Sequence, residues 1–167
     1  MSIIQAIILG FVQGITEFLP ISSSGHLILM RELLGLQVQG SLGFDAVLQL
    51  ATTLAVILYF SKDLWLLSQT ALRKLGRLPV NPKDLTLLYA LLIGTIPAVL
   101  AGLLLEKYMD TWFRNPVLVA SVFVLGSLLF MYAEWVYYKS VPQNNLSKMT
   151  GFKIGLFQCL ALVPGMS

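Results

Sequence analysis

The chain has 167 residues, of which 57% are hydrophobic and 11% are charged. Soluble domains carry about 25% charged residues and about 45–50% apolar ones, so this composition excludes an ordinary soluble domain and also a disordered chain. Cys159 is the only cysteine, which excludes a disulfide scaffold. The formal net charge is +3, but the basic residues are dispersed, which argues against nucleic-acid binding. The remaining class is an integral membrane protein.

Residues 1–36 predict a helical hairpin that dips into the bilayer and returns. An apolar run from Ser2 to Leu19 is interrupted at Pro20, and apolar residues resume over 26–36. Proline has no N–H and disfavours helical geometry in the residue before it, so the helix has to break there. Each arm is shorter than the roughly 20 residues that a transmembrane helix needs. We therefore expect a re-entrant hairpin, not a span.

Three stretches in the middle of the chain, 44–60, 86–105 and 117–138, are long and apolar enough to cross a membrane as helices. The second follows Asn81-Pro82, a dipeptide typical of a helix start. Gly76 and Pro79 indicate a linker just before it. Residues 44–138 therefore predict three transmembrane helices within an all-α polytopic membrane protein.

Residues 151–167 repeat the pattern of the first hairpin, with an apolar arm that breaks at Pro164. Because three spans separate the two hairpins, they would enter from opposite faces, as in an inverted-topology repeat. Eight Lys and Arg residues lie on the side of the 73–83 loop, against three on the other side. The positive-inside rule then places that loop in the cytoplasm and the base of the first hairpin outside.

Gln13 and Glu17 are four residues apart, so they share one face of the first arm. A carboxylate at membrane depth costs roughly 2.5–3.5 kcal/mol on insertion scales, which makes Glu17 a candidate functional residue. The alternative is that Glu17 lies at the interface or pairs with Arg31 without any chemical role.

The run Ser22-Ser23-Ser24-Gly25 separates the two arms and precedes His26, the only histidine. Hydroxyl and backbone N–H groups at a helix N-terminus form a cradle for phosphate. Serine, histidine and a nearby carboxylate also supply a nucleophile, a base and an acid. Plain helix capping is the competing interpretation.

Asp45 and Gln49 form a second polar pair four residues apart, at the outer end of the first span, where they could line the same cavity or merely cap a helix. Carboxylate, amide and hydroxyl oxygens together suit a hard cation such as Mg²⁺ or Ca²⁺, held jointly with phosphate oxygens.

Small and polar residues within the spans have structural explanations. Thr52 is expected to bond to its own helix. Gly94, Gly102 and Gly126 are expected to allow kinks and close helix contacts.

These residues resemble the undecaprenyl-diphosphate phosphatase family, bacterial membrane enzymes associated with bacitracin resistance. The family's motif Glu/Gln-x-x-x-Glu, followed by Pro-x-Ser-Ser-x-Gly-His, is matched by Gln13–Glu17 and Pro20–His26. Its second motif, Pro-Gly-x-Ser-Arg-Ser, is matched in part by Pro164–Ser167, and Phe44-Asp45 with Gln49 matches a further stretch.

The resemblance implies hydrolysis of a polyprenyl diphosphate lipid, undecaprenyl diphosphate, to the monophosphate and inorganic phosphate. This reaction recycles the carrier lipid for peptidoglycan synthesis in the bacterial inner membrane, at a site near the outer face. Glu17, Ser23 and His26 would be catalytic, with either Ser23 or His26 as the nucleophile. Gln13 and Glu17 would hold the metal or position water.

The resemblance also implies a substrate-binding set from both hairpins and the first span: Ser22, Ser24, Gly25, Asp45, Gln49, Gly165 and Ser167. In the family an arginine follows the second-motif serine, and in this chain nothing follows Ser167. We therefore expect a fragment, truncated in the second repeat and inactive on its own.

Two other function classes compete with the enzyme. A polyprenyl-phosphate transporter or flippase would also be built from broken helices in an inverted repeat, and a structural membrane subunit would need neither binding nor reactive groups. The reactive cluster around His26 favours the enzyme. A homo-oligomer is compatible with all three.

Overall fold

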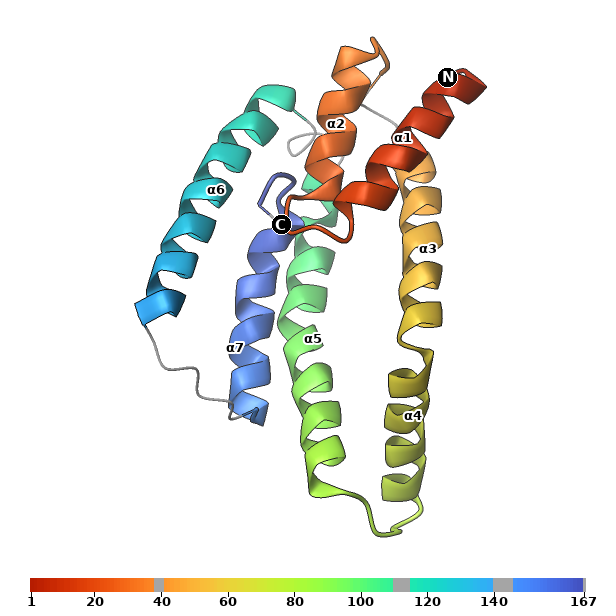
Figure 1. The fold of residues 1–167 in the computed structure, drawn as a ribbon, viewed down its shortest axis with the longest axis vertical. Coiled ribbons are helices and arrows are strands. Elements are labelled where there is room, and N and C mark those ends of the chain that lie inside the picture. The colour runs from red at the N-terminus through yellow and green to blue at the C-terminus, as the bar shows by residue number, and fades with distance from the viewer. Residues whose placement is uncertain (38–40, 110–114, 140–145, 167) are drawn as a thin grey trace.

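The computed structural model describes residues 1–37, 41–109, 115–139 and 146–166, and within these ranges the regular structure is entirely helical (Figure 1). The elements in chain order are α1 (Ile3–Thr16), α2 (Ser23–Leu33), α3 (Leu42–Tyr59), α4 (Ser61–Leu75), α5 (Pro82–Met109), α6 (Pro116–Lys139), α7 (Lys148–Gln158) and the 3₁₀ turn η1 (Cys159–Leu162).

Three of these helices, Leu42–Tyr59, Pro82–Lys107 and Pro116–Lys139, are long and apolar enough to cross a membrane, with mean hydropathies of 1.7, 2.3 and 2.1. They coincide with the three predicted spans. Most of their large apolar side chains are exposed on the outside of the bundle, which is the arrangement that a lipid environment accommodates. The prediction of an all-α polytopic membrane protein is confirmed.

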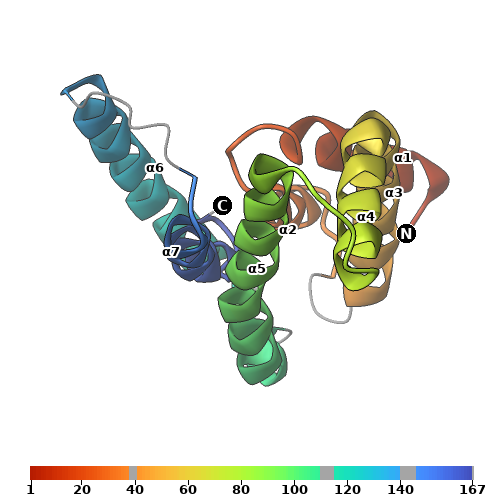
Figure 2. The ribbon, with the colours of Figure 1, turned by 90° about the horizontal axis from the view of Figure 1, so that it is seen from below.

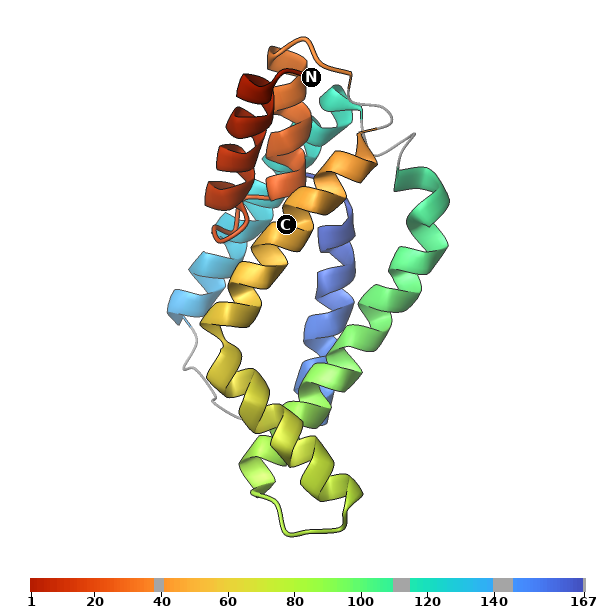
Figure 3. The same ribbon diagram turned by 90° about the vertical axis from the view of Figure 1, so that its right-hand side faces the viewer.

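The first hairpin has the predicted helix, break and helix. α1 ends at Thr16, with Glu17 as its C-cap, and α2 begins at Ser23, three residues before the predicted 26. Figures 1 and 3 show that α2 returns beside α1 toward the end of the molecule at which the chain begins. Residues 17–22 are therefore the turn of this hairpin, in the middle of the molecule.

The second break reaches the same place from the opposite end. α7 begins far from the α1–α2 hairpin and runs toward it, and the end of the described chain lies beside the first break (Figure 1). The backbone N–H of Gly165 donates to Ser22 Oγ at 2.8 Å. The two interrupted segments thus meet, while the inverted repeat and its bilayer orientation remain predictions.

The linker predicted at Gly76 and Pro79 is confirmed, because residues 76–81 join α4 to α5. Residues 61–75 form a helix that was not predicted, which follows α3 after a junction at Phe60. Asp63 in its first turn and Arg73 and Lys74 in its last turn complement the helix dipole. The charges at the two ends of α4 are therefore compatible with the helix.

Helices α5 and α7 pack backbone to backbone through small residues, and they lie side by side in Figures 1 and 2. A Cβ placed on Gly94 would lie 2.8 Å from the carbonyl oxygen of Gly151. A Cβ on Gly151 or Gly155 would collide with the backbone of Ala90 or Gly94. The predicted close contact at Gly94 is confirmed.

The other two span glycines differ from each other. A Cβ on Gly126 of α6 would lie 3.1 Å from the carbonyl oxygen of Gly165, so the close contact predicted there is also confirmed. At Gly102 a Cβ would meet nothing within 4 Å among the residues that the structure describes, so the close contact expected there is not found in this part of the chain.

Candidate active site

Glu17 is the hub of a polar cluster at the end of α1. Its Oε2 accepts hydrogen bonds from Ser23 Oγ at 2.5 Å, from Gln13 Nε2 at 2.9 Å and from Gln49 Nε2 at 3.5 Å. The carboxylate is only half-buried. Three predicted site residues from α1, α2 and α3 are thus brought together on one carboxylate oxygen.

Gln13 supports this cluster from within the bundle. It is 1% exposed, and its Nε2 also lies 3.4 Å from Thr52 Oγ1 on α3. Thr52 in turn donates to backbone carbonyls of its own helix, as predicted. The Oε1 atom of Gln13 is buried and has no hydrogen-bond partner within the described ranges. One buried polar atom of the cluster therefore lacks a partner in the described structure.

Ser22 caps α2 from a conformation that is unfavourable for a side-chain-bearing residue. Its φ is 63° and its ψ is 91°, in a region that costs on the order of 1–3 kcal/mol. Its Oγ accepts from Gly25 N at 3.4 Å and from Gly165 N at 2.8 Å, and it lies 3.5 Å from Ser24 Oγ. Helix capping is therefore confirmed for Ser22, which also ties the two breaks together.

His26 is held in one orientation by the backbone. Its Nδ1 lies 2.8 Å from the carbonyl oxygen of Ser22. A carbonyl oxygen can only accept, so Nδ1 carries the proton, and in the neutral ring Nε2 keeps its lone pair. The ring of Phe123 packs edge-on against the imidazole, with centroids 5.0 Å apart and planes at 78°. Nε2 is therefore the reactive nitrogen.

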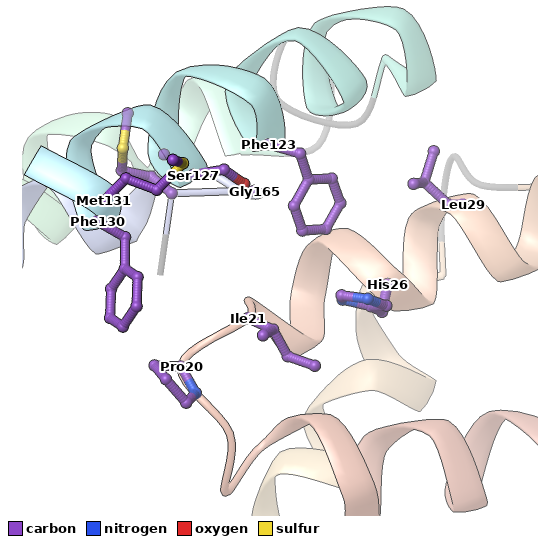
Figure 4. Close-up of a pocket in the computed structure, with 11 residues that line it drawn as sticks. Pro20, Ile21, His26, Leu29, Phe123, Ser127, Phe130, Met131 and Gly165 are labelled. Atoms are coloured by element: carbon purple, nitrogen blue, oxygen red, sulfur yellow. The ribbon is translucent and has the colours of Figure 1, made fainter. Parts of the chain in front are cut away.

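A cavity of about 580 Å³ opens between α2 and α6 beside His26. Figure 4 shows that α2 and the turn before it form one wall and α6 the other, with Gly165 nearby. The lining is mostly apolar and consists of Pro20, Ile21, His26, Leu29, Phe123, Gly126, Ser127, Phe130, Met131, Gly165 and Met166. The imidazole thus borders a space suited to an apolar ligand.

Asp45 is placed apart from Glu17. It forms an ion pair with Arg31 at 2.5 Å, and the two side chains are 15% and 3% exposed. The Arg31 guanidinium also lies over the ring of Phe44, 5.6 Å from its centroid. The alternative that Arg31 pairs with Glu17 is therefore wrong, and of the second predicted pair only Gln49 joins the Glu17 cluster.

Two contributors were missed by sequence reasoning. Phe123 comes from α6 and Thr52 was assigned only to its own helix, because contacts between distant helices leave no local pattern in the sequence. Gly165 contributes its backbone, with a φ of +99° that favours glycine. Ser167 lies outside the described residues.

The donor set for a metal is small. No group of three or more His, Cys, Asp or Glu side chains that could hold an ion occurs in the described parts of the chain. The hard oxygens at the cluster are the Glu17 carboxylate and the unpartnered Oε1 of Gln13. These fit a Mg²⁺ or Ca²⁺ ion that takes its remaining ligands from phosphate and water.

The fold and this cluster define a multi-pass α-helical membrane protein with reactive polar groups where two interrupted helices meet. Residues 6–167 match the family described as "Bacitracin resistance protein BacA". The chain belongs to this family.

Curated relatives agree with this assignment. The chain is similar over 100% of its length to proteins named undecaprenyl-diphosphatase from Micrococcus luteus (38% identity), Corynebacterium striatum (41%) and Rubrobacter xylanophilus (41%). It spans 61%, 59% and 62% of the lengths of these relatives. No solved structure matches the fold.

Proposed function

We propose that the protein containing this chain is a membrane phosphatase that hydrolyses undecaprenyl diphosphate to undecaprenyl phosphate and inorganic phosphate. The observation that carries this proposal is the 2.5 Å hydrogen bond from Ser23 Oγ to Glu17 Oε2, on the same first turns of α2 as His26, whose Nδ1 contact with the Ser22 carbonyl leaves Nε2 available. The names of the relatives support the substrate. The reaction would recycle the carrier lipid, and so contribute to cell-wall synthesis and bacitracin resistance.

Ser23 is the nucleophile that this geometry supports best. Its hydroxyl proton already points to Glu17, so the carboxylate accepts that proton as Oγ attacks the terminal phosphorus. The bond from that phosphorus to the bridging oxygen breaks, and undecaprenyl phosphate leaves. The terminal phosphoryl group is then carried on Ser23.

His26 completes the turnover in this proposal. Its Nε2 takes a proton from the water that attacks the phosphoserine, while Nδ1 stays bonded to the Ser22 carbonyl. The bond from phosphorus to Ser23 Oγ breaks, Oγ takes back its proton from Glu17, and the products are inorganic phosphate and free Ser23. The alternative, in which His26 itself attacks phosphorus, would place the phosphoryl group on Nε2 instead.

In this proposal the start of α2 binds the diphosphate of the substrate, and the neighbouring cavity binds its lipid chain. The N-terminus of a helix favours an anion, and Ser24 and Gly25 lie in the first turn of α2. The apolar cavity beside His26 fits the isoprenyl units next to the diphosphate. Both ends of a polyprenyl diphosphate would therefore find a matching surface.

Gln13 and Glu17 would hold a Mg²⁺ or Ca²⁺ ion through Gln13 Oε1 and the Glu17 carboxylate. When bound, such an ion neutralises charge on the phosphate oxygens. Because the basic loop residues favour the opposite face, we place the site near the outer face of the inner membrane.

The test is inorganic phosphate release from undecaprenyl diphosphate in detergent, using the protein that contains this chain at the length of its relatives. Ser23→Ala and His26→Gln are expected to lose at least about 100-fold in kcat. The control is Ser121→Ala, because this exposed serine bonds only to its own helix. Binding of the lipid without phosphate release, with or without Mg²⁺ or Ca²⁺, would contradict the phosphatase and favour the transporter.

A further inference from the structure

One face of α6 is the common wall of both helix breaks. Val119, Phe123 and Gly126 follow the i, i+4, i+7 spacing, so they share that face. Val119 is fully buried and packs with Ile28 of α2, with Phe123 against the same cluster. At Gly126, helix α6 approaches the backbone of Gly165. Between these two contacts lies Phe123, at the level of His26.

Phe123 touches the catalytic segment at two adjacent residues. Its ring meets the His26 imidazole edge-on at 5.0 Å. The same ring lies over Gly25, where an added Cβ would be 2.7 Å from Phe123 Cζ. Glycine at position 25 therefore allows this aromatic ring to sit against the helix backbone beside His26.

The imidazole then has two restraints of different kinds. The hydrogen bond from Nδ1 to the Ser22 carbonyl selects the protonated nitrogen. The edge-on contact with Phe123 restrains the ring plane, which the hydrogen bond alone leaves free to swing. With both in place, the imidazole is held where His26 lines the cavity (Figure 4).

We propose that Phe123 is a positioning residue that fixes the ring of His26 so that Nε2 faces the substrate with its lone pair free. This role rests on the proposed phosphatase for its kinetic consequence, but the ring orientation can be measured without any activity. Phe123 does not touch the reacting atoms in this account.

The first experiment is ¹⁵N NMR of the histidine ring in the detergent-solubilised protein, with the His26 signal assigned by its loss in His26→Gln. Wild type is expected to show one tautomer, protonated at Nδ1. Phe123→Leu is expected to show averaged or doubled ring signals. Phe130→Leu is the matched control, because Phe130 lines the same cavity from the same helix and is expected to leave the His26 signal unchanged.

Folding of each variant is checked by size-exclusion elution and helical circular dichroism. Phe123→Met is measured beside Phe123→Leu, because methionine fills the space with a flexible chain.

A second pair of variants tests the contact itself. Gly25→Ala should displace the Phe123 ring and disturb the His26 signal, and Gly25→Ala combined with Phe123→Leu should add little beyond the larger single effect.

The kinetic expectation is a fall in kcat of about threefold to tenfold in Phe123→Leu, in line with the strength of an aromatic pair, with KM within about twofold. A single set of His26 ring signals, unchanged from wild type, together with unchanged kcat in the folded Phe123 variants would overturn the proposal. If wild type released no phosphate, the proposed function would fail, while the NMR comparison would still decide whether Phe123 orients His26.

Discussion

The α1–α2 hairpin and the α5–α7 pair use their polar and small residues in opposite ways. At the hairpin, side chains bond to each other and converge on Glu17. Between α5 and α7, glycines remove side chains so that the two backbones touch. Polar side chains therefore gather where the helix is broken, and close backbone packing occurs where the helices are continuous. Substitutions in the two regions should therefore have separable effects.

The largest expected effect is on catalysis at the hairpin. Glu17→Gln keeps the size of the side chain but removes the group that accepts the Ser23 proton. We expect kcat to fall about 1,000-fold, equivalent to about 4 kcal/mol, with an unfolding temperature within a few degrees of wild type. Stopped phosphate-release assays and thermal unfolding in detergent measure the two quantities. If Glu17→Gln unfolded the protein, the hairpin would be needed for stability as well, which would contradict the separate roles of the hairpin and the α5–α7 pair.

The Arg31–Asp45 ion pair connects the hairpin to α3. Disrupting this pair is expected to have the second-largest effect. Because Arg31 is 3% exposed, Asp45→Asn leaves a buried cation without its partner charge. We expect a loss of about 3 kcal/mol in unfolding free energy, near the lower end for a broken buried pair. The control is Asp63→Asn at an exposed position of α4. A raised KM with unchanged stability would instead assign Asp45 to substrate binding, as the family resemblance suggested.

At the α5–α7 interface, Gly155→Ala is expected to force the helices apart, because its Cβ would collide with the backbone of Gly94. The expected loss is about 2–3 kcal/mol in stability, typical of overpacking against a rigid neighbour. Gly102→Ala on α5 is the matched control, since an added Cβ there has room within the described structure. Thermal unfolding should separate the two variants, and equal stability would show that the close approach is unimportant.

The smallest expected effect concerns the link between the two breaks. Ser22→Ala removes the oxygen that accepts from Gly165 N and Gly25 N, with an expected loss of about 1 kcal/mol. Ser22→Gly should be the more stable of the two variants, because glycine adopts a φ of 63° without strain. The reverse order in thermal unfolding would show that the hydroxyl and the backbone geometry do not have the roles assigned to them.

Much of this arrangement could be predicted from local pattern. The three long helices followed from uninterrupted apolar length, and the hairpin followed from Pro20 and the serine run. The shared face of Gln13 and Glu17 followed from helical spacing. Each of these features depends on residues that are close in sequence.

What escaped prediction depends on contacts between distant segments. Arg31 could have paired with either Glu17 or Asp45, and only the packing of α2 against its neighbours decides for Asp45. The contact between Phe123 and His26 joins two helices with no spacing rule between them. Helix α4 was missed for a different reason, since Ser61–Leu75 carries several charged residues and lacks the uninterrupted apolar length that predicted the three spans.

The most direct test of the account is to trap the phosphorylated protein by acid quench, using substrate labelled in its terminal phosphate. The account predicts an acid-stable label on Ser23 that accumulates in His26→Gln, where hydrolysis of the intermediate is slowed, and that is absent in Ser23→Ala. An acid-labile label that disappears in His26→Gln would place the phosphoryl group on the histidine. Turnover without any label would likewise contradict the pairing of Ser23 with Glu17 as the reacting unit.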